Sequence, residues 1–460
     1  MEVAEEHWRR MILLRRAVDV EPEETRATLM SFVFFFFVLS GYFVLRPIRD
    51  AVAAASGVQQ LPWLFTGTLT ATLLFNPLFS WLVVRYPARK FVPISFQFFV
   101  ANLLLFYAMM RFVSPGEGSA IDIWTGRSFY VWTSVLAFFG TSIFWCFMAD
   151  VFRSDQAKRL FGFIGVGGTI GSIAGSTVTA TLAPRIGPVN LLLVSAALLE
   201  LAALTVMNFP SSPRGVGSAP ASVATDAIDN EVIGGTLMNG VTSVLKSRYL
   251  LGIALFLILY SVGSTFLYFQ QSDIVGRFYA DRVARTTILA RLELAAQILT
   301  VLAQVFFTGR IIRWIGLAAT LAVLPALSML GFGALGVMPV FTTLAIFTVL
   351  RRATNFSLTN PAMETLFTVV PREDKYKAKS FIETFVYRGG DQLAAWLYAG
   401  LAAVGLGLAG IAFVAVPVSF VWLLLGVWLG RRQAALAANE TNRRDAVSNL
   451  ATPLLMTTGG

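Results

Sequence analysis

The chain has 460 residues, of which 56% are hydrophobic and only 13% are charged, and it carries a net charge of +10. A soluble domain has about twice that charged fraction, so the composition excludes a soluble globular protein. The basic residues lie between apolar runs rather than on one face, which argues against nucleic acid as a partner. We therefore expect an integral membrane protein whose main partner is the lipid bilayer.

The sequence lacks the residues that most metal sites and hydrolytic enzymes need. It has one histidine, His7, ahead of the first apolar run, and one cysteine, Cys146, inside an apolar run. Neither a His/Cys metal site nor a nucleophile and base triad can be assembled from them. Residues 1–28 carry charge at both ends and no small-residue cleavage site, so we expect no cleavable signal. We expect no metal, no cofactor and no enzymatic activity.

Apolar stretches recur along the chain, each near the roughly 20 residues needed to cross about 30 Å of hydrocarbon. Six stretches precede residue 210 and six follow residue 248. Two of the boundaries between neighbouring spans fall inside long uncharged runs, and only glycine and proline residues indicate where they lie. The predicted spans are 29–45, 61–84, 91–110, 128–149, 160–184, 186–209, 249–272, 286–309, 314–335, 340–359, 379–404 and 408–430.

The two sets of six spans are separated by a segment rich in Pro, Gly and Ser, which begins PSSPRGVGSAPAS and is typical of a flexible linker. Most Lys and Arg residues fall on the cytoplasmic side if the N-terminus is placed there, so both termini are expected in the cytoplasm of a bacterial inner membrane. The expected parts are a cytoplasmic segment 1–28, a six-helix bundle 29–209, a cytoplasmic linker 210–248, a second six-helix bundle 249–430 and a cytoplasmic tail 431–460.

Six plus six spans with both ends inside is the layout of the major facilitator superfamily, whose halves are themselves repeats. The loop after span two reads SWLVVRYP at 80–87, and the loop after span eight reads GRIIRWIG at 309–316. This echo supports the repeat, although basic loops that only fix topology explain it equally well. The expected fold class is an all-α membrane protein with 12 transmembrane helices in two six-helix bundles, the major facilitator superfamily fold.

Three stretches carry a resemblance to a narrower family. They are YFVLRPIRD at 42–50, FWCFMADVFRSDQAKRLFG at 144–162, and RRATNFSLTNPAME at 351–364 followed by PREDKYKAKSFIE at 371–383. In this order they resemble the motifs of the ATP/ADP antiporter family, the nucleotide exchangers of plastids and intracellular bacteria, and of its bacterial relatives. The resemblance covers both halves and implies a secondary transporter of the major facilitator type.

The chain departs from that family at two charged positions. The nucleotide exchangers carry an acidic residue in span four, where this chain has Thr133 or Ser134, and a lysine in span eleven, where it has Asp391. One charge of a nucleotide site is therefore lost and another is reversed. The resemblance thus implies transport more firmly than it implies the substrate.

A charge at mid-membrane costs at least about 2.5 kcal/mol on insertion scales, so charges within spans are the main candidates for a site. Arg388 and Asp391 lie near the middle of span eleven, on one helical face. They are either a structural ion pair or a substrate and proton-coupling site.

A second charged set lies at the end of span one, where Arg46, Arg49 and Asp50 share a face around Pro47. If the helix continues past this proline, these side chains point into a cavity. If the helix stops there, Arg46 reaches the lipid headgroups instead.

Two further spans carry polar groups that we predict to bind substrate. In span eight Glu293 and Gln297 share a face while Arg291 points elsewhere. In span ten we expect one of two adjacent arginines to face the translocation path. The predicted groups are Arg291, Glu293, Gln297, Arg351, Arg352 and Asn355.

Glu200 is the lone acid near the middle of span six. A carboxyl in a medium of low dielectric constant favours its neutral form, which suits a proton carrier and equally a passive hydrogen-bonded acid. Glu200 and Asp391 are the candidates for proton coupling.

Span five holds a glycine pattern, with Gly167, Gly171 and Gly175 spaced every four residues. The pattern lacks the preceding strand and the Gly-Lys ending of a phosphate loop. It is typical of a stripe that lets two membrane helices approach closely, so we expect packing rather than ligand binding.

Arginines outnumber acids among the span charges expected to reach a cavity, and guanidinium groups match phosphate or carboxylate by paired hydrogen bonds. We therefore expect a secondary active transporter that works by alternating access and moves or exchanges a small anionic solute, such as a nucleotide or another phosphorylated metabolite. A proton-coupled exporter of amphipathic compounds, a lipid transporter and a non-transporting scaffold are the alternatives. A monomer is compatible with the sequence.

Overall fold

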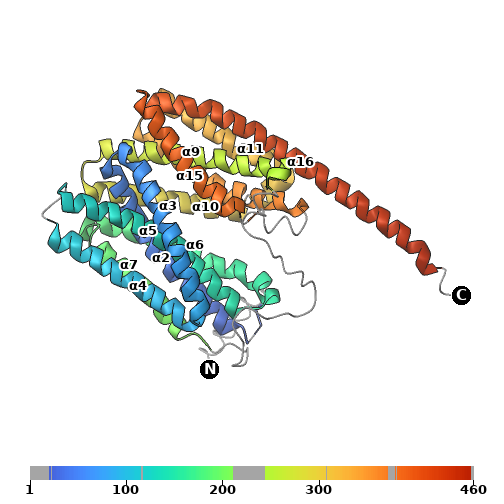
Figure 1. Cartoon of the computed structure of the whole chain (residues 1–460), viewed down its shortest axis with the longest axis horizontal. Coiled ribbons are helices and arrows are strands. Elements are labelled where there is room, and N and C mark those ends of the chain that lie inside the picture. The colour runs from blue at the N-terminus through green and yellow to red at the C-terminus, as the bar shows by residue number, and fades with distance from the viewer. Residues whose placement is uncertain are drawn as a thin grey trace. The chain divides into compact units, whose positions relative to one another are not determined.

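The computed structural model describes residues 20–21, 23–114, 118–210, 244–306, 308–370, 379 and 381–456, and these form helices joined by short connections (Figure 1). The described part of the chain holds thirteen α-helices. They are α2 (Thr25–Ser56), α3 (Leu61–Arg85), α4 (Ala88–Ala108), α5 (Ala120–Val151), α6 (Ser154–Ile186), α7 (Leu191–Met207), α9 (Arg248–Phe278), α10 (Arg282–Phe306), α11 (Thr308–Val337), α12 (Phe341–Thr354), α13 (Asn360–Leu366), α15 (Tyr387–Ala403) and α16 (Leu408–Met456).

Eight stretches of the described residues are helical, long and apolar enough to cross a membrane. They are Thr25–Ser56, Ala88–Val113, Ala120–Val151, Arg159–Ile186, Arg248–Phe278, Arg282–Phe306, Trp314–Val337 and Leu408–Asn439. The shorter helix α7 is also apolar. The chain is therefore an all-helical, multi-pass membrane protein.

The expected spans do not correspond one to one with α-helices, because π-helical turns interrupt the chain. The π-helix η3 (Asn355–Thr359) separates α12 from α13 without a break in the helical run. A second π-helix, η5 (Ile382–Val386), leads directly into α15. A π turn adds one residue to a helical turn, and such turns gather at functional sites.

Several helix ends follow from local sequence. Glycines with positive φ, a conformation that other residues rarely adopt, close two long helices at Gly57 after α2 and Gly187 after α6. Ser119 caps the start of α5, where its side chain accepts a hydrogen bond from the backbone N–H of Asp122. Pro62 lies in the first turn of α3, where a missing N–H costs nothing.

The chain divides into two compact units, each of which is described separately. Unit 1 contains residues 1–230 and 275–297, and unit 2 contains residues 231–274 and 298–460. The end of α9 and the first part of α10 therefore pack with helices α2 to α7. The expected linker 210–248 lies outside the described residues except at its ends, as do residues 1–19 and 371–378.

Helix α2 is central to unit 1 and packs against α5, α6 and α7. A buried aromatic core supports it, in which the centre of the Phe144 ring lies 5.2 Å from that of Phe34 and 4.0 Å from that of Phe35. On α7, the Ser195 hydroxyl donates a 2.9 Å hydrogen bond to the Gly41 carbonyl of α2. Burial of large side chains on two faces thus fixes α2 within this unit.

The glycine stripe of α6 faces the backbone of α2. A methyl group at Gly167, Gly171 or Gly175 would overlap the carbonyl oxygens of Phe32, Phe36 and Ser40, respectively. One turn further on, the Thr179 hydroxyl donates to the Val44 carbonyl at 3.1 Å. The packing interpretation of this stripe is confirmed, because the small residues bring two helix backbones into contact.

Unit 2 has a comparable close seam between α11 and α16. On α16, a methyl group at Gly430 would overlap Ala318 of α11, and one at Gly426 would lie 3.1 Å from the Leu321 carbonyl. The fully buried Trp422 of α16 packs its ring against Phe256 of α9 at 5.3 Å. Helix α16 then continues as one long helix toward the C-terminus (Figure 1).

Candidate functional site

The first candidate group lies in unit 1 and is called here the Arg46 cluster. Helix α2 continues through Pro47 to Ser56, so the charged residues at the predicted end of span one lie on one uninterrupted helix. The first part of α10, which belongs to the same unit, supplies the other members. The cluster consists of Arg46, Arg49, Asp50, Glu293 and Gln297.

Arg46 and Glu293 form the ion pair of this cluster. Nη1 of Arg46 lies 3.3 Å from Oε1 of Glu293, and the two side chains are 19% and 5% exposed. The same carboxylate oxygen accepts a 3.2 Å hydrogen bond from Nε2 of Gln297, one helical turn further along α10. Nε of Arg46 is buried without a hydrogen-bond partner among the described residues. The carboxylate therefore neutralises Arg46 but leaves one of its donors open.

Arg49 pairs with its neighbour Asp50 and also contacts α5. Its Nε and Nη2 atoms donate to Oδ1 of Asp50 at 3.0 and 2.8 Å. Nη1 lies 3.5 Å from the Ser134 hydroxyl, and the guanidinium sits 5.3 Å from the centre of the Tyr130 ring. Ser134 is one of the two positions matched to the acidic residue of the nucleotide exchangers, and here Asp50 supplies the counter-charge.

A further ion pair in unit 1 was not predicted from the sequence. Nη2 of Arg282, the first residue of α10, donates to both carboxylate oxygens of Asp122 on α5, at 2.9 and 2.8 Å. Both residues lie at helix ends rather than within apolar runs. Charges inside apolar spans are the criterion for the predicted site residues, and these two residues do not meet it. Their position in the first turn of a helix is the sequence signal that could have found them.

The second candidate group lies in unit 2 and is called here the Arg351 cluster. Arg351 lies in the last turn of α12, and its side chain reaches two neighbouring helices. Nε donates to the Ser328 hydroxyl of α11, and Nη2 donates to the Tyr260 carbonyl of α9, both at 3.3 Å. The cluster consists of Arg351, Asn355, Tyr260, Ser328 and Tyr387.

Arg351 is the buried cation that lacks an acidic partner. The residue is 4% exposed, and among the residues that the structure describes no carboxylate pairs with it. Its guanidinium lies 5.3 Å from the centre of the Tyr260 ring, a cation–π contact. Gly263 makes room for Nη2, because a methyl there would lie 3.2 Å from that atom. The positive charge is thus stabilised only by neutral groups.

Asn355 extends the cluster at the point where α12 gives way to the π-helix η3. Its Nδ2 atom donates to the Tyr260 hydroxyl at 3.1 Å. Its Oδ1 atom is buried and has no hydrogen-bond partner within the described part of the chain. Because Arg351 and Asn355 are four residues apart and both contact Tyr260, they present donors and an open acceptor on one side of the helix.

Tyr387, the first residue of α15, stacks on Tyr260 with ring centres 6.1 Å apart. The Ser261 hydroxyl donates to the Tyr387 carbonyl at 3.4 Å. Asp391 lies one turn along α15 from Tyr387, on the same helix as Arg388. Arg388 and Asp391 lie three residues apart on α15. Whether they form a structural ion pair or a binding site stays a prediction.

Three further predicted residues are not members of either cluster. Arg291 is exposed on α10, and Arg352 is half-buried beside Arg351. Glu200 is half-buried on α7 and makes no hydrogen bond or ion pair with a described residue. The two clusters together hold ten residues. Of the two adjacent arginines, Arg351 is buried and Arg352 is half-buried, a difference that the sequence left undecided.

The balance of charges differs from the simple excess of arginines that the sequence suggests. Arg46 pairs with Glu293, and Arg49 pairs with Asp50. These two arginines are compensated by acids. Arg351 is buried and has no carboxylate partner among the described residues.

Known proteins similar to this chain are transporters of nucleotides. A family model described as TLC ATP/ADP transporter matches residues 115–335. The "ADP,ATP carrier protein 2" of Chlamydia pneumoniae is 23% identical over 92% of this chain and 90% of its own length. The protein of the same name from Chlamydia trachomatis is 23% identical over 87% of each chain. These matches confirm the resemblance to the ATP/ADP antiporter family that three sequence motifs predicted.

Solved structures similar to this one are also transporters. A bacterial homologue of the iron transporter ferroportin gives a TM-score of 0.60 at 10% identity and covers 90% of this chain and 99% of that chain. The xylose transporter XylE gives 0.57 at 13% identity and covers 87% and 95%. At such low identity these likenesses show the fold alone, which this chain shares with solved transporter structures. The chain is therefore similar in sequence and in fold to proteins named as membrane transporters.

Proposed function

We propose that the chain is a secondary active transporter that moves or exchanges a small anionic solute by alternating access, the mode in which a site opens to one side of the membrane at a time. A nucleotide is the first candidate, because the relatives are named as ADP,ATP carriers. Another phosphorylated metabolite is the second candidate, because two charged positions of the nucleotide exchangers differ here. The location is the bacterial inner membrane, with both termini in the cytoplasm.

The observation that carries this proposal is the buried guanidinium of Arg351. A charged side chain within a membrane is costly and persists where it meets a partner or a wet path. Arg351 has no acidic partner among the described residues, and only two of its five N–H donors are used by Ser328 and Tyr260. A phosphate or carboxylate oxygen would satisfy the remaining donors and supply the missing negative charge.

Twelve spans in two bundles of six, at residues 29–209 and 249–430, are part of the same proposal. Eight helices qualify as spans by length and composition, and α3 and α7 add two hydrophobic helices between them. The run α12, η3 and α13, with 14, 5 and 7 residues, supplies another, and η5 with α15 supplies the twelfth. On this proposal η3 lies in span ten and η5 in span eleven, and Asn355 and Tyr387 of the Arg351 cluster lie in or directly after these π turns.

Uptake into proteoliposomes tests the proposal. Purified protein is reconstituted into vesicles loaded with ATP, ADP, inorganic phosphate or buffer, and entry of labelled ATP, ADP or phosphate is measured. We expect uptake that depends on an anion inside the vesicle. Uptake of lipophilic cations driven by a pH gradient, with no response to any internal anion, would instead support the proton-coupled exporter.

Substitution of Arg351 then tests the residue. We expect Arg351→Gln to lower kcat/KM for the anion about 30-fold or more, since losing one partner of a buried charged contact costs about 2–5 kcal/mol. Arg351→Lys should retain part of the activity, because lysine keeps the charge without the planar fork. The matched control is Arg185→Gln at the exposed end of α6, which should transport normally. Normal transport by Arg351→Gln would contradict the assignment.

A further inference from the structure

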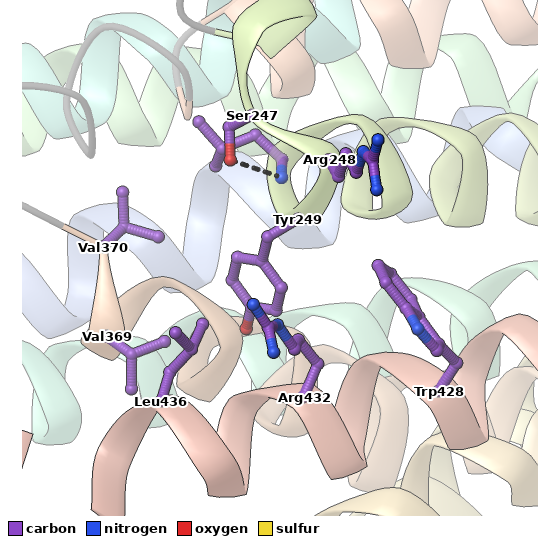
Figure 2. Close-up of a pocket in the computed structure, with 9 residues that line it drawn as sticks. Ser247, Arg248, Tyr249, Val369, Val370, Trp428, Arg432 and Leu436 are labelled. Carbon is purple, nitrogen blue, oxygen red and sulfur yellow. Dashed lines mark hydrogen bonds between the residues drawn. The ribbon is translucent and has the colours of Figure 1, made fainter. Parts of the chain in front are cut away.

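A pocket of about 540 Å³ lies in unit 2, where the start of α9, the 3-10 turn η4 (Phe367–Val369) and α16 meet (Figure 2). None of its lining residues belongs to the Arg351 cluster. Its volume falls within the roughly 300–1,000 Å³ range of pockets that take small organic molecules. The lining residues are Ser247, Arg248, Tyr249, Leu250, Val369, Val370, Trp428, Arg432 and Leu436.

Two guanidinium groups form the polar side of this pocket. Arg248 is the first residue of α9, and Arg432 follows the last apolar turn of α16. Both side chains are exposed, and neither makes an ion pair or hydrogen bond with any residue in the described ranges. Figure 2 shows Arg432 directed toward Tyr249 across the pocket. Two cations from different helices therefore line one cavity without an acid to neutralise them.

The other side of the pocket is apolar. Val369, Val370 and Leu436 line it together with the ring of Trp428, which is 42% exposed. Tyr249 is buried, and its hydroxyl already donates to the Leu366 carbonyl at 2.8 Å. That hydroxyl is thus committed to the fold, and a ligand would meet cationic groups on one side and hydrocarbon on the other.

Both helices leave the hydrocarbon region at this pocket. Helix α9 becomes apolar immediately after Arg248, and α16 is apolar up to Gly430, where Arg431 and Arg432 follow. Tryptophan and arginine at the end of an apolar helix mark the membrane interface. The side of the membrane rests on the topology of the proposed function: with both termini in the cytoplasm, this interface is the cytoplasmic leaflet, whose anionic lipids attract basic side chains.

We propose that this pocket binds the headgroup of an anionic phospholipid from the cytoplasmic leaflet. Arg248 and Arg432 hold the phosphate through charge-assisted hydrogen bonds. Trp428, Val370 and Leu436 contact the glycerol and the first methylene groups of the acyl chains. A free phosphate ion would use the two arginines but would leave the apolar wall bare, so the mixed lining favours a lipid.

Native mass spectrometry and thermal unfolding of the full chain test this site. The protein is delipidated in detergent and titrated with phosphatidylglycerol, with phosphatidylcholine or with inorganic phosphate. We expect phosphatidylglycerol to bind and to raise the unfolding temperature, while phosphatidylcholine and phosphate have a much smaller effect. Equal stabilisation by phosphate would overturn the lipid assignment in favour of a simple anion site, and equal stabilisation by phosphatidylcholine would overturn it in favour of unspecific lipid contact.

The double variant Arg248→Gln/Arg432→Gln should bind phosphatidylglycerol about 30-fold more weakly, since each basic residue near an anionic membrane surface contributes about 1 kcal/mol and 1.4 kcal/mol is a factor of ten. The matched control Arg431→Gln removes the neighbouring exposed arginine, which does not line the pocket, and should bind like the wild type. The same weakening in both variants, or none in either, would overturn the proposal.

A conservative variant shows whether weaker binding in the glutamine variant results from misfolding rather than from loss of the charges. Arg248→Lys/Arg432→Lys keeps both charges and should retain most of the binding, and its unfolding temperature without lipid should match the wild type. Trp428→Ala should weaken phosphatidylglycerol and leave the response to inorganic phosphate unchanged. Because these measurements do not depend on transport, their outcome is separate from that of the proposed function.

Discussion

Arg46 of α2 and Glu293 of α10 form an ion pair, with Nη1 3.3 Å from Oε1, although 247 positions separate them in the sequence. The carboxylate is nearly inaccessible, and Gln297 adds a hydrogen bond to it. This contact joins the first predicted span to the eighth within unit 1. It connects parts of the chain that the sequence assigns to different halves.

Removal of the carboxylate should destabilise the protein. In Glu293→Ala we expect a loss of about 3–5 kcal/mol, because Arg46 would stay buried without its counter-charge. Thermal unfolding in detergent measures the loss. The double variant Arg46→Gln/Glu293→Ala should lose less than the sum of the two single variants, which would show that the residues are coupled. Strict additivity would mean that the pair contributes nothing.

An acidic residue introduced into α5 should take over the role of Asp50 as the counter-charge of Arg49. Asp50→Asn removes the carboxylate that accepts two hydrogen bonds from Arg49 and should lower the unfolding temperature. Ser134→Asp places a carboxylate where the Arg49 guanidinium already approaches within 3.5 Å. We expect the double variant Asp50→Asn/Ser134→Asp to recover most of the lost stability. Ser134→Asn, which adds a similar volume without charge, is the control and should not rescue Asp50→Asn.

The glycine seam between α2 and α6 should not tolerate a methyl group. Gly171→Ala would place one against the Phe36 carbonyl, and we expect a loss of about 1–3 kcal/mol because the helices must separate. Gly165→Ala in the same helix meets no atom within 4 Å and should be neutral or stabilising by up to about 1 kcal/mol. Thermal unfolding compares the two, and equal effects would show that contact with α2 is not the cause.

A negative charge beside Arg351 should prevent anion uptake. In Asn355→Asp the new carboxylate can pair with Arg351, four residues away, and thereby remove the unpaired charge that a substrate would meet. We expect uptake in proteoliposomes to fall at least about tenfold, the effect of 1.4 kcal/mol. Asn355→Ala serves as the control and should show a smaller loss, because the charge of Arg351 survives. A variant Asn355→Asp that transports as well as Asn355→Ala would argue against an anionic substrate at this cluster.

Much of the fold could be predicted because each feature depends on neighbouring residues. The apolar runs predict the helices, and the spacing of Gly167, Gly171 and Gly175 predicts the close approach of another helix. The four-residue interval between Glu293 and Gln297 likewise predicts their common face. None of these inferences requires knowledge of which helices pack together.

The pairing of distant groups could not be predicted in this way. Hydropathy treats all apolar runs alike, so it does not show that Glu293 would meet Arg46. It also does not decide which of the adjacent Arg351 and Arg352 turns inward, since a rotation of about 100° per residue separates them. The π turns at η3 and η5 had no recognised sequence pattern, and they set the direction of Asn355 and Tyr387. The domain boundaries and the roles of the site residues stay predictions.

The contact between α2 and α6 limits how the arginines of α2 can move. Side chains between two helices normally absorb small displacements, but here the glycines of α6 lie directly against the α2 backbone from Phe32 to Ser40. The Thr179 hydroxyl adds a hydrogen bond to the Val44 carbonyl, two residues before Arg46. Without intervening side chains, the two helices cannot shift against each other without a backbone clash. We therefore expect α2 and α6 to move together, so that any displacement of Arg46 and Arg49 also displaces α6.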